Sequence, residues 1–143
     1  MRSLLRDLHA LAAWLFVGTI VVQVFLAGAA IANLGGSGSF VAHIDFGYNA
    51  VGLSALAVVL TAAASRMPRG DVGVAFGLLV LYIVQTALPQ FRASIPMVAA
   101  LHPVNAMLLF GLSAWYARRA SRSRSVASSA PLVGAPDGES GRP

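Results

Sequence analysis

Cysteine and lysine are both absent from the 143-residue sequence. Without cysteine the chain cannot form disulfides, thiolate metal sites, iron–sulfur clusters or a covalent c-type haem attachment. Charged residues of either sign are also scarce, at 10% of the sequence, where a soluble domain usually has about a quarter. Hydrophobic residues make up 57%. This balance excludes an ordinary soluble domain and predicts a compact integral membrane protein.

Four long apolar runs follow one another along the chain. They cover residues 8–32, 42–64, 72–88 and 95–117. Each has about 17–25 residues, the length that a helix needs to cross the roughly 30 Å hydrocarbon core of a bilayer. Continuous apolar runs without strand-like alternation favour helices, whose backbone groups are satisfied in lipid. Because the connections are short, we predict an all-α, four-helix transmembrane bundle, up-down-up-down, over residues 8–117.

The distribution of arginine predicts the orientation of the bundle. Arginines cluster before the first run, between the second and third, and after the fourth, whereas the other two connections share only Arg92. The positive-inside rule then places both termini in the cytoplasm. Residues 118–143 are rich in Ser, Arg, Pro and Gly and are predicted to form a disordered basic cytoplasmic tail. Since the arginines lie at helix ends, the net charge of +5 argues for a lipid bilayer as partner and against nucleic acid.

The first apolar run could be either a cleaved signal peptide or a transmembrane helix, because a charged segment precedes it as in a signal peptide. The run is longer than the hydrophobic region of a usual signal peptide, and we expect it to be retained as a helix. His9, close to Arg6 and Asp7 at the start of this run, is expected to be an ordinary interfacial histidine.

Polar residues inside the apolar runs gather at one depth. With depth measured from each helix midpoint at about 1.5 Å per residue, they fall in the outer half of the bundle, with His43 just above the others. Polar side chains are costly in lipid and usually face the interior of a bundle. This layer therefore predicts a site between the helices. Its members come from all four helices: Gln23, Asn49, Gln85, His102 and Asn105.

A weak internal repeat relates the first two helices to the last two. In "VVQVFLAG" and "IVQTALP" a glutamine, Gln23 or Gln85, follows a pair of β-branched residues, and a histidine, His43 or His102, lies on the next helix. The motifs "YNA" and "VNA" follow the histidines. Parallel repeats of this kind are related by an axis along the membrane normal. The repeat predicts that the two histidines lie on diagonal helices and face each other across the core.

Two facing histidines suit the axial ligation of haem iron, which helix bundles hold between facing helices. Zinc needs about four ligands, and Asp45 is the one carboxylate nearby, so zinc suits these residues less well. Gly47, one turn after His43, would let a flat macrocycle approach the backbone, and Arg92 would pair with its propionates. The remaining polar residues would support the ligands through hydrogen bonds: Gln23, Gln85, Asn49 and Asn105.

The same polar residues have a second interpretation as interhelical hydrogen bonds, worth about 0.6–2 kcal/mol each. The chain would then be a non-catalytic membrane subunit, and we expect no enzyme activity in either case. A small-molecule carrier has less support, because the four short helices are not expected to bury an acid or base pair.

His102 also has a simpler interpretation, as the cap of a helix that begins at Pro103. That helix would have only about 15 residues before Arg118, which is short for a span. We therefore expect the fourth helix to begin near Ile95 and to kink at Pro103.

The segments "HIDFG", which contains His43, and "LHPVNA", which contains His102, carry a family resemblance. A four-helix unit with these histidines on its second and fourth helices, about 60 residues apart, resembles one half of haem A synthase. In that family the even helices of each half supply the axial ligands of a b-type haem, which implies the same role here. The chain has half that family's length, and its first outer loop, "NLGGSGS", lacks the family's loop chemistry. The resemblance therefore implies haem ligation and not synthase activity.

The motif "LHPVNA" is also similar to the signature of small four-helix bacterial membrane proteins that form a domain family of unknown function. Together these patterns predict a multi-pass protein of the bacterial plasma membrane. It would bind haem b for electron transfer or redox sensing, with a redox partner or within a larger membrane complex.

Overall fold

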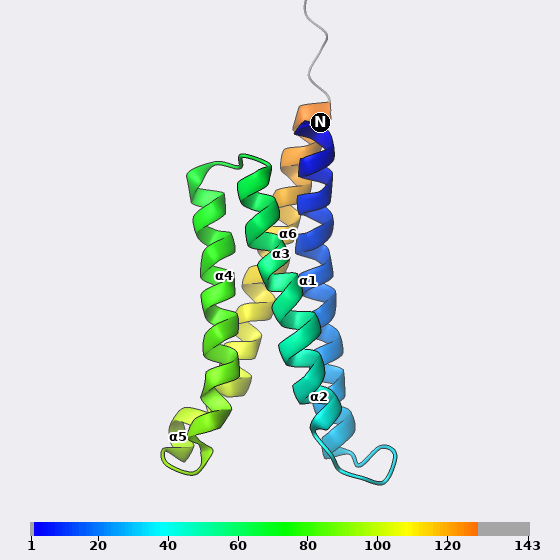
Figure 1. The fold of residues 1–143 in the computed structure, drawn as a ribbon, viewed down its shortest axis with the longest axis vertical. Helices are drawn as coiled ribbons and strands as arrows, with labels where there is room; N and C mark the ends of the chain where they lie inside the picture. Colours follow the sequence, from blue (N-terminus) through cyan, green and yellow to red (C-terminus); the bar gives the residue numbers. More distant parts are fainter. Residues whose placement is uncertain (1, 129–143) are drawn as a thin grey trace, which may run out of the picture.

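The computed structural model describes residues 2–128, and every regular element in that part of the chain is helical (Figure 1). The elements α2 (Val41–Phe46), η1 (Gly47–Val51) and α3 (Gly52–Ala64) follow one another without a break and form one continuous helical rod. In chain order the elements are α1 (Arg2–Ile31), α2 (Val41–Phe46), the π-helix η1 (Gly47–Val51), α3 (Gly52–Ala64), α4 (Arg69–Ala87), the 3₁₀ helix η2 (Leu88–Arg92), α5 (Pro96–Ala99) and α6 (His102–Ser128).

Four helical stretches among the described residues are long and apolar enough to cross a membrane. Many of their large apolar side chains are exposed, including Phe25, Leu53 and Met107. Such a surface suits lipid tails, since soluble proteins rarely expose apolar patches of this extent. The structure agrees with the prediction of four apolar helices and is compatible with a multi-pass membrane protein. The stretches are Ser3–Ile31, Val41–Ala64, Arg69–Arg92 and Pro96–Arg122.

Small residues line the contacts between the helices. α1 packs along α3 and α6, and α4 packs against the same two helices. Three alanines at the centre of the bundle, Ala62, Ala75 and Ala117, are completely buried. Because their side chains are short, the helix backbones approach closely and gain van der Waals contact, which drives helix association in lipid.

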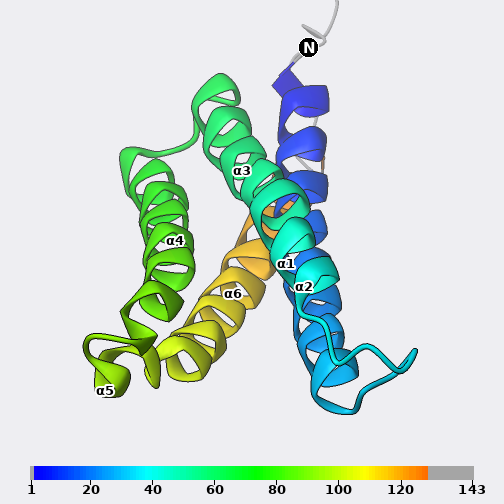
Figure 2. The same cartoon turned by 60° about the horizontal axis from the view of Figure 1, so that its bottom comes forward.

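The two ends of the bundle differ. At the basic end, where the turn between α3 and α4 and the C-terminal half of α6 lie, the long helices are close together (Figure 1). At the loop end, formed by residues 32–40 and 93–95, α2 and α5 lie well apart in both views (Figure 1, Figure 2). The first of these loops reverses direction through Gly35, Gly36 and Gly38, whose φ angles are positive. Glycine adopts this conformation without strain.

A buried polar network joins four helices at the basic end. His9 of α1 is only 1% exposed; its Nδ1 lies 2.9 Å from Thr61 Oγ1 on α3, and its Nε2 lies 3.1 Å from Tyr116 Oη on α6. The Tyr116 hydroxyl donates to the backbone carbonyl of Asp71 on α4, and the Asp71 carboxylate accepts a hydrogen bond of 2.6 Å from Arg119 Nε. His9 is therefore not an ordinary exposed histidine at the helix end, because hydroxyls from two distant segments satisfy its ring inside the protein.

The fourth apolar run also departs from the prediction. It is not one helix kinked at Pro103: α5 ends at Ala99 and α6 begins at His102, so Pro103 lies in the first turn of α6. A proline fits there because the first turn requires no N–H donor. The length objection to this helix start fails, because α6 continues through Arg118 as far as Ser128.

The start of α1 and the end of α6 both differ from the boundaries predicted from the sequence. α1 begins at Arg2, before the apolar run, because the amphipathic segment that precedes residue 8 continues the same helix. The first turns of the tail that was expected to be disordered belong to α6, which is helical as far as Ser128. The rest of the expected tail, residues 129–143, lies outside the described residues.

Candidate functional site

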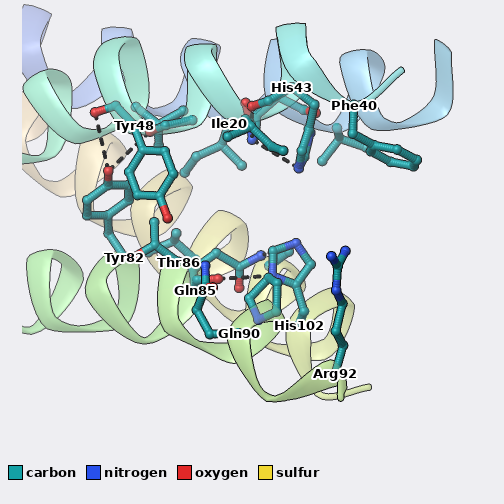
Figure 3. A pocket seen from close by; sticks show the side chains of 18 of the residues that line it. Ile20, Phe40, His43, Tyr48, Tyr82, Gln85, Thr86, Gln90, Arg92 and His102 are labelled. Atoms are coloured by element: carbon teal, nitrogen blue, oxygen red, sulfur yellow. Dashed lines mark hydrogen bonds between the residues drawn. The ribbon is translucent and has the colours of Figure 1, made fainter. Parts of the chain in front are cut away.

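A pocket of about 720 Å³ lies between the helices near the loop end (Figure 3). Its volume falls in the range of roughly 300–1,000 Å³ that is usual for small-molecule and cofactor sites. Its walls come from α1, α2, η1, α4, η2 and α6. Residues singled out in the sequence make up much of this lining: Gln23, His43, Gly47, Gln85, Arg92 and His102.

The first pair of helices holds His43 against Gln23. His43 Nδ1 lies 3.0 Å from the backbone oxygen of Gln23, which can only accept, so Nδ1 carries the ring proton. The side-chain Nε2 of Gln23 lies 3.2 Å from His43 Nε2 and 2.9 Å from the His43 carbonyl oxygen. Gln23 therefore bonds to both ring nitrogens of His43. Its backbone carbonyl accepts from Nδ1–H, and its side-chain amide donates to the lone pair on Nε2.

The second pair of helices repeats this arrangement with His102 and Gln85. His102 Nδ1 lies 3.0 Å from the Gln85 backbone oxygen, and the Gln85 amide nitrogen lies 3.2 Å from His102 Nε2. Asn105 extends the cluster: its Nδ2 donates to Gln85 Oε1 at 2.7 Å and to the Leu81 carbonyl at 3.1 Å. Asn105 is only 8% exposed, so these are buried bonds between α4 and α6. The internal repeat of the sequence thus corresponds to the same histidine–glutamine geometry in each half.

The two imidazoles meet across the pocket. Their ring centroids are 6.4 Å apart and their planes are inclined at 72°. In Figure 3, His43 reaches into the pocket from one wall and His102 from the opposite wall. Since each Nδ1 donates to a backbone carbonyl, each Nε2 carries a lone pair, to which the neighbouring glutamine amide donates. This is the tautomer in which histidine commonly binds a metal.

A π-helical turn follows directly after α2. In η1 the regular α-helical pairing is interrupted, and the hydroxyl of Tyr82 on α4 donates to the Gly47 carbonyl at 3.1 Å and lies 3.4 Å from the Tyr48 carbonyl. Gly52 permits this contact, because a Cβ at that position would lie 2.5 Å from Tyr82 Oη. Single π turns inside helices occur frequently at functional sites. Here the turn forms one wall of the pocket.

Gly47 leaves room for the amide that holds His43. A Cβ at Gly47 would lie 2.6 Å from Gln23 Nε2. The sequence suggested that this glycine makes space for a flat macrocycle. The structure gives it a closer neighbour, the Gln23 amide, although Gly47 also lines the pocket.

Asn49 does not belong to the polar layer. Its Nδ2 donates to the Asp45 carbonyl within its own helix at 2.8 Å, and the residue is exposed. The structure therefore shows Asn49 bonded within its own helix and not, as the sequence had suggested, between helices. Asn49 lies within the π turn η1, which changes the helical phase after His43, so a residue at the right depth faces outward.

Aromatic walls are the part of the site that the sequence reasoning missed. Phe40, Tyr48 and Tyr82 all line the pocket, and the Phe40 ring meets the His43 ring edge-on with centroids 6.0 Å apart. Within an apolar run an aromatic residue that faces lipid is hard to distinguish from one that faces a pocket. For Tyr82 a signal existed, since a tyrosine hydroxyl inside a membrane helix needs a hydrogen-bond partner.

The side chains available as ligands limit which metal ion or metal-containing cofactor the pocket could hold. Residues 2–128 contain no cluster of three or more His, Cys, Asp or Glu side chains that could hold a metal ion. Two imidazole nitrogens do not complete a tetrahedral zinc site, but they match the axial ligands of a haem iron. Arg92 lies beside His102 at the edge of the pocket (Figure 3), where a cation suits the carboxylates of such a group. Two imidazoles and an arginine are residue types that could hold a b-type haem.

A comparison with protein families matches part of the chain. Residues 23–92 match a family of unknown function, DUF6220. The matched segment contains Gln23, His43, Gln85 and Arg92, whereas His102 and the "LHPVNA" motif lie outside it. No curated protein and no solved structure matches the chain.

Proposed function

We propose that this chain is a small integral membrane protein that binds one b-type haem, with His43 and His102 as axial ligands. The haem would give the protein a one-electron redox centre, for electron transfer or redox sensing. The proposal assigns no enzyme activity to the chain.

The spacing of the imidazoles is the observation that carries this proposal. An iron–nitrogen bond of about 2 Å and roughly 1.2 Å from nitrogen to ring centre put the centroids about 6 Å apart in a bis-histidine haem. In this chain the separation is 6.4 Å. Two imidazoles that both lack a proton on Nε2 cannot hydrogen-bond to each other. In the structure the Gln23 and Gln85 amides donate to these two lone pairs, and an iron ion between the imidazoles would take the place of both amides.

The surroundings of the histidines support the same ligand. Backbone carbonyls of Gln23 and Gln85 hold each Nδ1–H, which fixes the orientation of the ring and raises the basicity of the ligating nitrogen. Phe40 and Tyr48 supply aromatic surface for a flat apolar ring system. Arg92 supplies the charge for an anionic group at the loop end.

The proposal includes a membrane orientation. Arg66, Arg69 and Arg119 lie at the basic end, together with Arg118 and Arg122, whereas Arg92 lies near the loop end. The positive-inside rule places the basic end in the cytoplasm, with an up-down-up-down topology. The pocket would then lie in the outer half of a bacterial plasma membrane. A redox partner, or a larger membrane complex, would reach the haem from that side.

Visible spectroscopy tests the proposal. The full chain, expressed with haem available and purified in detergent, should show the Soret band of a six-coordinate low-spin haem that shifts on reduction. Haem content per monodisperse protein should fall sharply in His43→Ala together with His102→Ala. The matched control is His9→Gln, which changes the third histidine of the chain and should leave the haem content unchanged.

Two results would contradict haem binding. One is a wild-type protein without a Soret band after expression with haem. The other is a Soret band that persists when both His43 and His102 are replaced by alanine.

A second candidate function has a specific observation behind it. In the structure the Gln23 and Gln85 amides already lie within hydrogen-bonding distance of the Nε2 atoms. The two clusters can therefore stabilise the bundle without any ligand, as interhelical bonds of a non-catalytic membrane subunit. Absence of haem, combined with reduced thermal stability of both histidine variants, would favour this second function.

A further inference from the structure

We infer that His43 is the exchangeable axial position of this site, and that a neutral diatomic ligand such as carbon monoxide or nitric oxide takes its place. The inference rests on the proposed haem and adds a ligand class to it. It follows from an inequality between the two histidines, which the internal repeat does not by itself suggest.

The His102 side of the pocket is firmly held. His102 begins α6, a long helix that packs along α1 and α4. One turn later Asn105 is buried and donates to both Gln85 Oε1 and the Leu81 carbonyl. The Gln85 amide therefore forms hydrogen bonds through both its oxygen and its nitrogen. These bonds restrict movement of the His102 ring away from the pocket.

The His43 side is held much less firmly. His43 lies in α2, which has six residues, none of them buried, and packs mainly against α1. The amide that holds its ring has no counterpart to Asn105: Gln23 Oε1 is buried without a hydrogen-bond partner. A buried acceptor without a partner carries a free-energy cost. The Gln23 amide therefore bonds to His43 alone, whereas the Gln85 amide bonds to both His102 and Asn105.

The π turn gives α2 a way to move. It separates the His43 segment from the packed helix α3 and is closed by the Tyr82 hydroxyl at the Gly47 and Tyr48 carbonyls. Conversion of this turn to α geometry would rotate α2 by one residue, roughly 100°, relative to α3. Such a rotation carries the His43 ring away from the pocket while α3 keeps its place.

The exchange is a simple substitution at the iron. The bond to His43 Nε2 breaks, a bond to the carbon or nitrogen of the diatomic forms, and no proton or electron is transferred. The Gln23 amide, 3.2 Å from His43 Nε2, is then beside the incoming ligand as a hydrogen-bond donor. The apolar surface around it, including Ile20 and Phe40, favours a neutral ligand over an anion.

Carbon monoxide binding to the haem-loaded full chain, reduced chemically in detergent, tests the inference. The wild type should form a carbon monoxide complex at a rate that becomes independent of gas concentration, because release of His43 limits it. His43→Ala should keep its haem within about twofold and bind in one fast step, whereas His102→Ala should lose haem about tenfold or more.

Tyr82→Phe provides a test that keeps both histidines. It removes the hydroxyl that closes the π turn and should raise the limiting rate of carbon monoxide binding. Gly77→Ala, on the same helix at a position where a Cβ meets no atom within 4 Å, is the matched control and should leave the rate unchanged.

The outcomes separate this inference from the proposed function. A wild type with a bis-histidine haem that forms no carbon monoxide complex overturns the inference and leaves the proposed function standing. Equal haem loss in the two histidine variants, with no rate change in Tyr82→Phe, does the same. A wild type without haem contradicts the proposed function, and the inference with it.

Discussion

Asn105 and Asn49 have similar neighbours in the sequence but different partners in the structure. Both precede an alanine, in "VNA" and "YNA", and both were placed at the same depth of the bundle. Asn105 is buried and bonds to Gln85 on a neighbouring helix, whereas Asn49 is exposed and bonds within its own helix. At the scale of single residues, depth along a helix was predictable from the sequence, but the direction of the side chain was not.

This difference predicts unequal effects of alanine at the two positions. Asn105→Ala should lower the free energy of unfolding in detergent by about 1–2 kcal/mol, because it removes two buried interhelical bonds. Asn49→Ala, the matched control, should change it by less than about 0.5 kcal/mol. Equilibrium unfolding in a denaturing detergent measures both. Losses of equal size would show that Asn105 is not held as the structure indicates.

Among the histidines, the sequence repeat associated a glutamine with two and gave no associated residue for the third. Gln23 and Gln85 each precede their histidine by one helix and lie in a repeated pattern, so those pairs could be expected. His9 bonds to Thr61 and Tyr116, which are 52 and 107 residues away. A contact of that separation depends on which helices become neighbours, and no local pattern carries that information.

The π turn is the decisive feature at the scale of helical elements. Apolar composition predicted the rod over residues 42–64, since every turn of it is apolar. The extra width of η1 was not predictable, because it depends on Tyr82 of another helix and on the absence of a side chain at Gly52. The start of α6 at His102 was missed for a similar reason: the length argument assumed that the helix ends at Arg118.

Gly52→Ala tests whether Tyr82 closes this turn. The new Cβ would lie 2.5 Å from Tyr82 Oη, so the tyrosine ring must move and its bonds to the η1 carbonyls break. We expect a loss of about 1–3 kcal/mol in the free energy of unfolding. Gly77→Ala, which meets open space, should be neutral or slightly stabilising. If thermal unfolding shows the two variants to be equally stable, Tyr82 does not secure the turn.

At the scale of the whole molecule, the two ends of the bundle differ: a hydrogen-bond network connects the helices at the basic end, and a pocket separates them at the loop end. The His9 network connects α1, α3, α4 and α6 at the basic end. The pocket occupies the loop end, where α2 and α5 diverge (Figure 2). The four apolar helices and the asymmetric placement of arginine were evident in the sequence, but this contrast in packing depends on side chains that meet only in the folded bundle.

The proposed orientation predicts which end faces outward in a cell. Because the chain lacks cysteine, single-cysteine variants report on one position each. Ser37→Cys, in the first connecting loop, should react with a membrane-impermeant maleimide in intact bacterial cells. Ser3→Cys, in the first turn of α1, should react only after lysis. Labelling of Ser3→Cys alone in intact cells would reverse the orientation and place the pocket in the cytoplasmic half.

The local character of the histidine–glutamine pairs has a consequence for biosynthesis. Gln23 and His43 belong to the first hairpin and Gln85 and His102 to the second, so each pair can form before the hairpins meet. Since N-terminal segments emerge from the ribosome first, the first half of the pocket exists while the second is still being made. In each pair the glutamine amide donates a hydrogen bond to the Nε2 lone pair of the imidazole. The two halves meet where α6 packs on α1 and α4 packs on α3. If a ligand is held by both histidines as proposed, its site is complete only after the two hairpins have assembled.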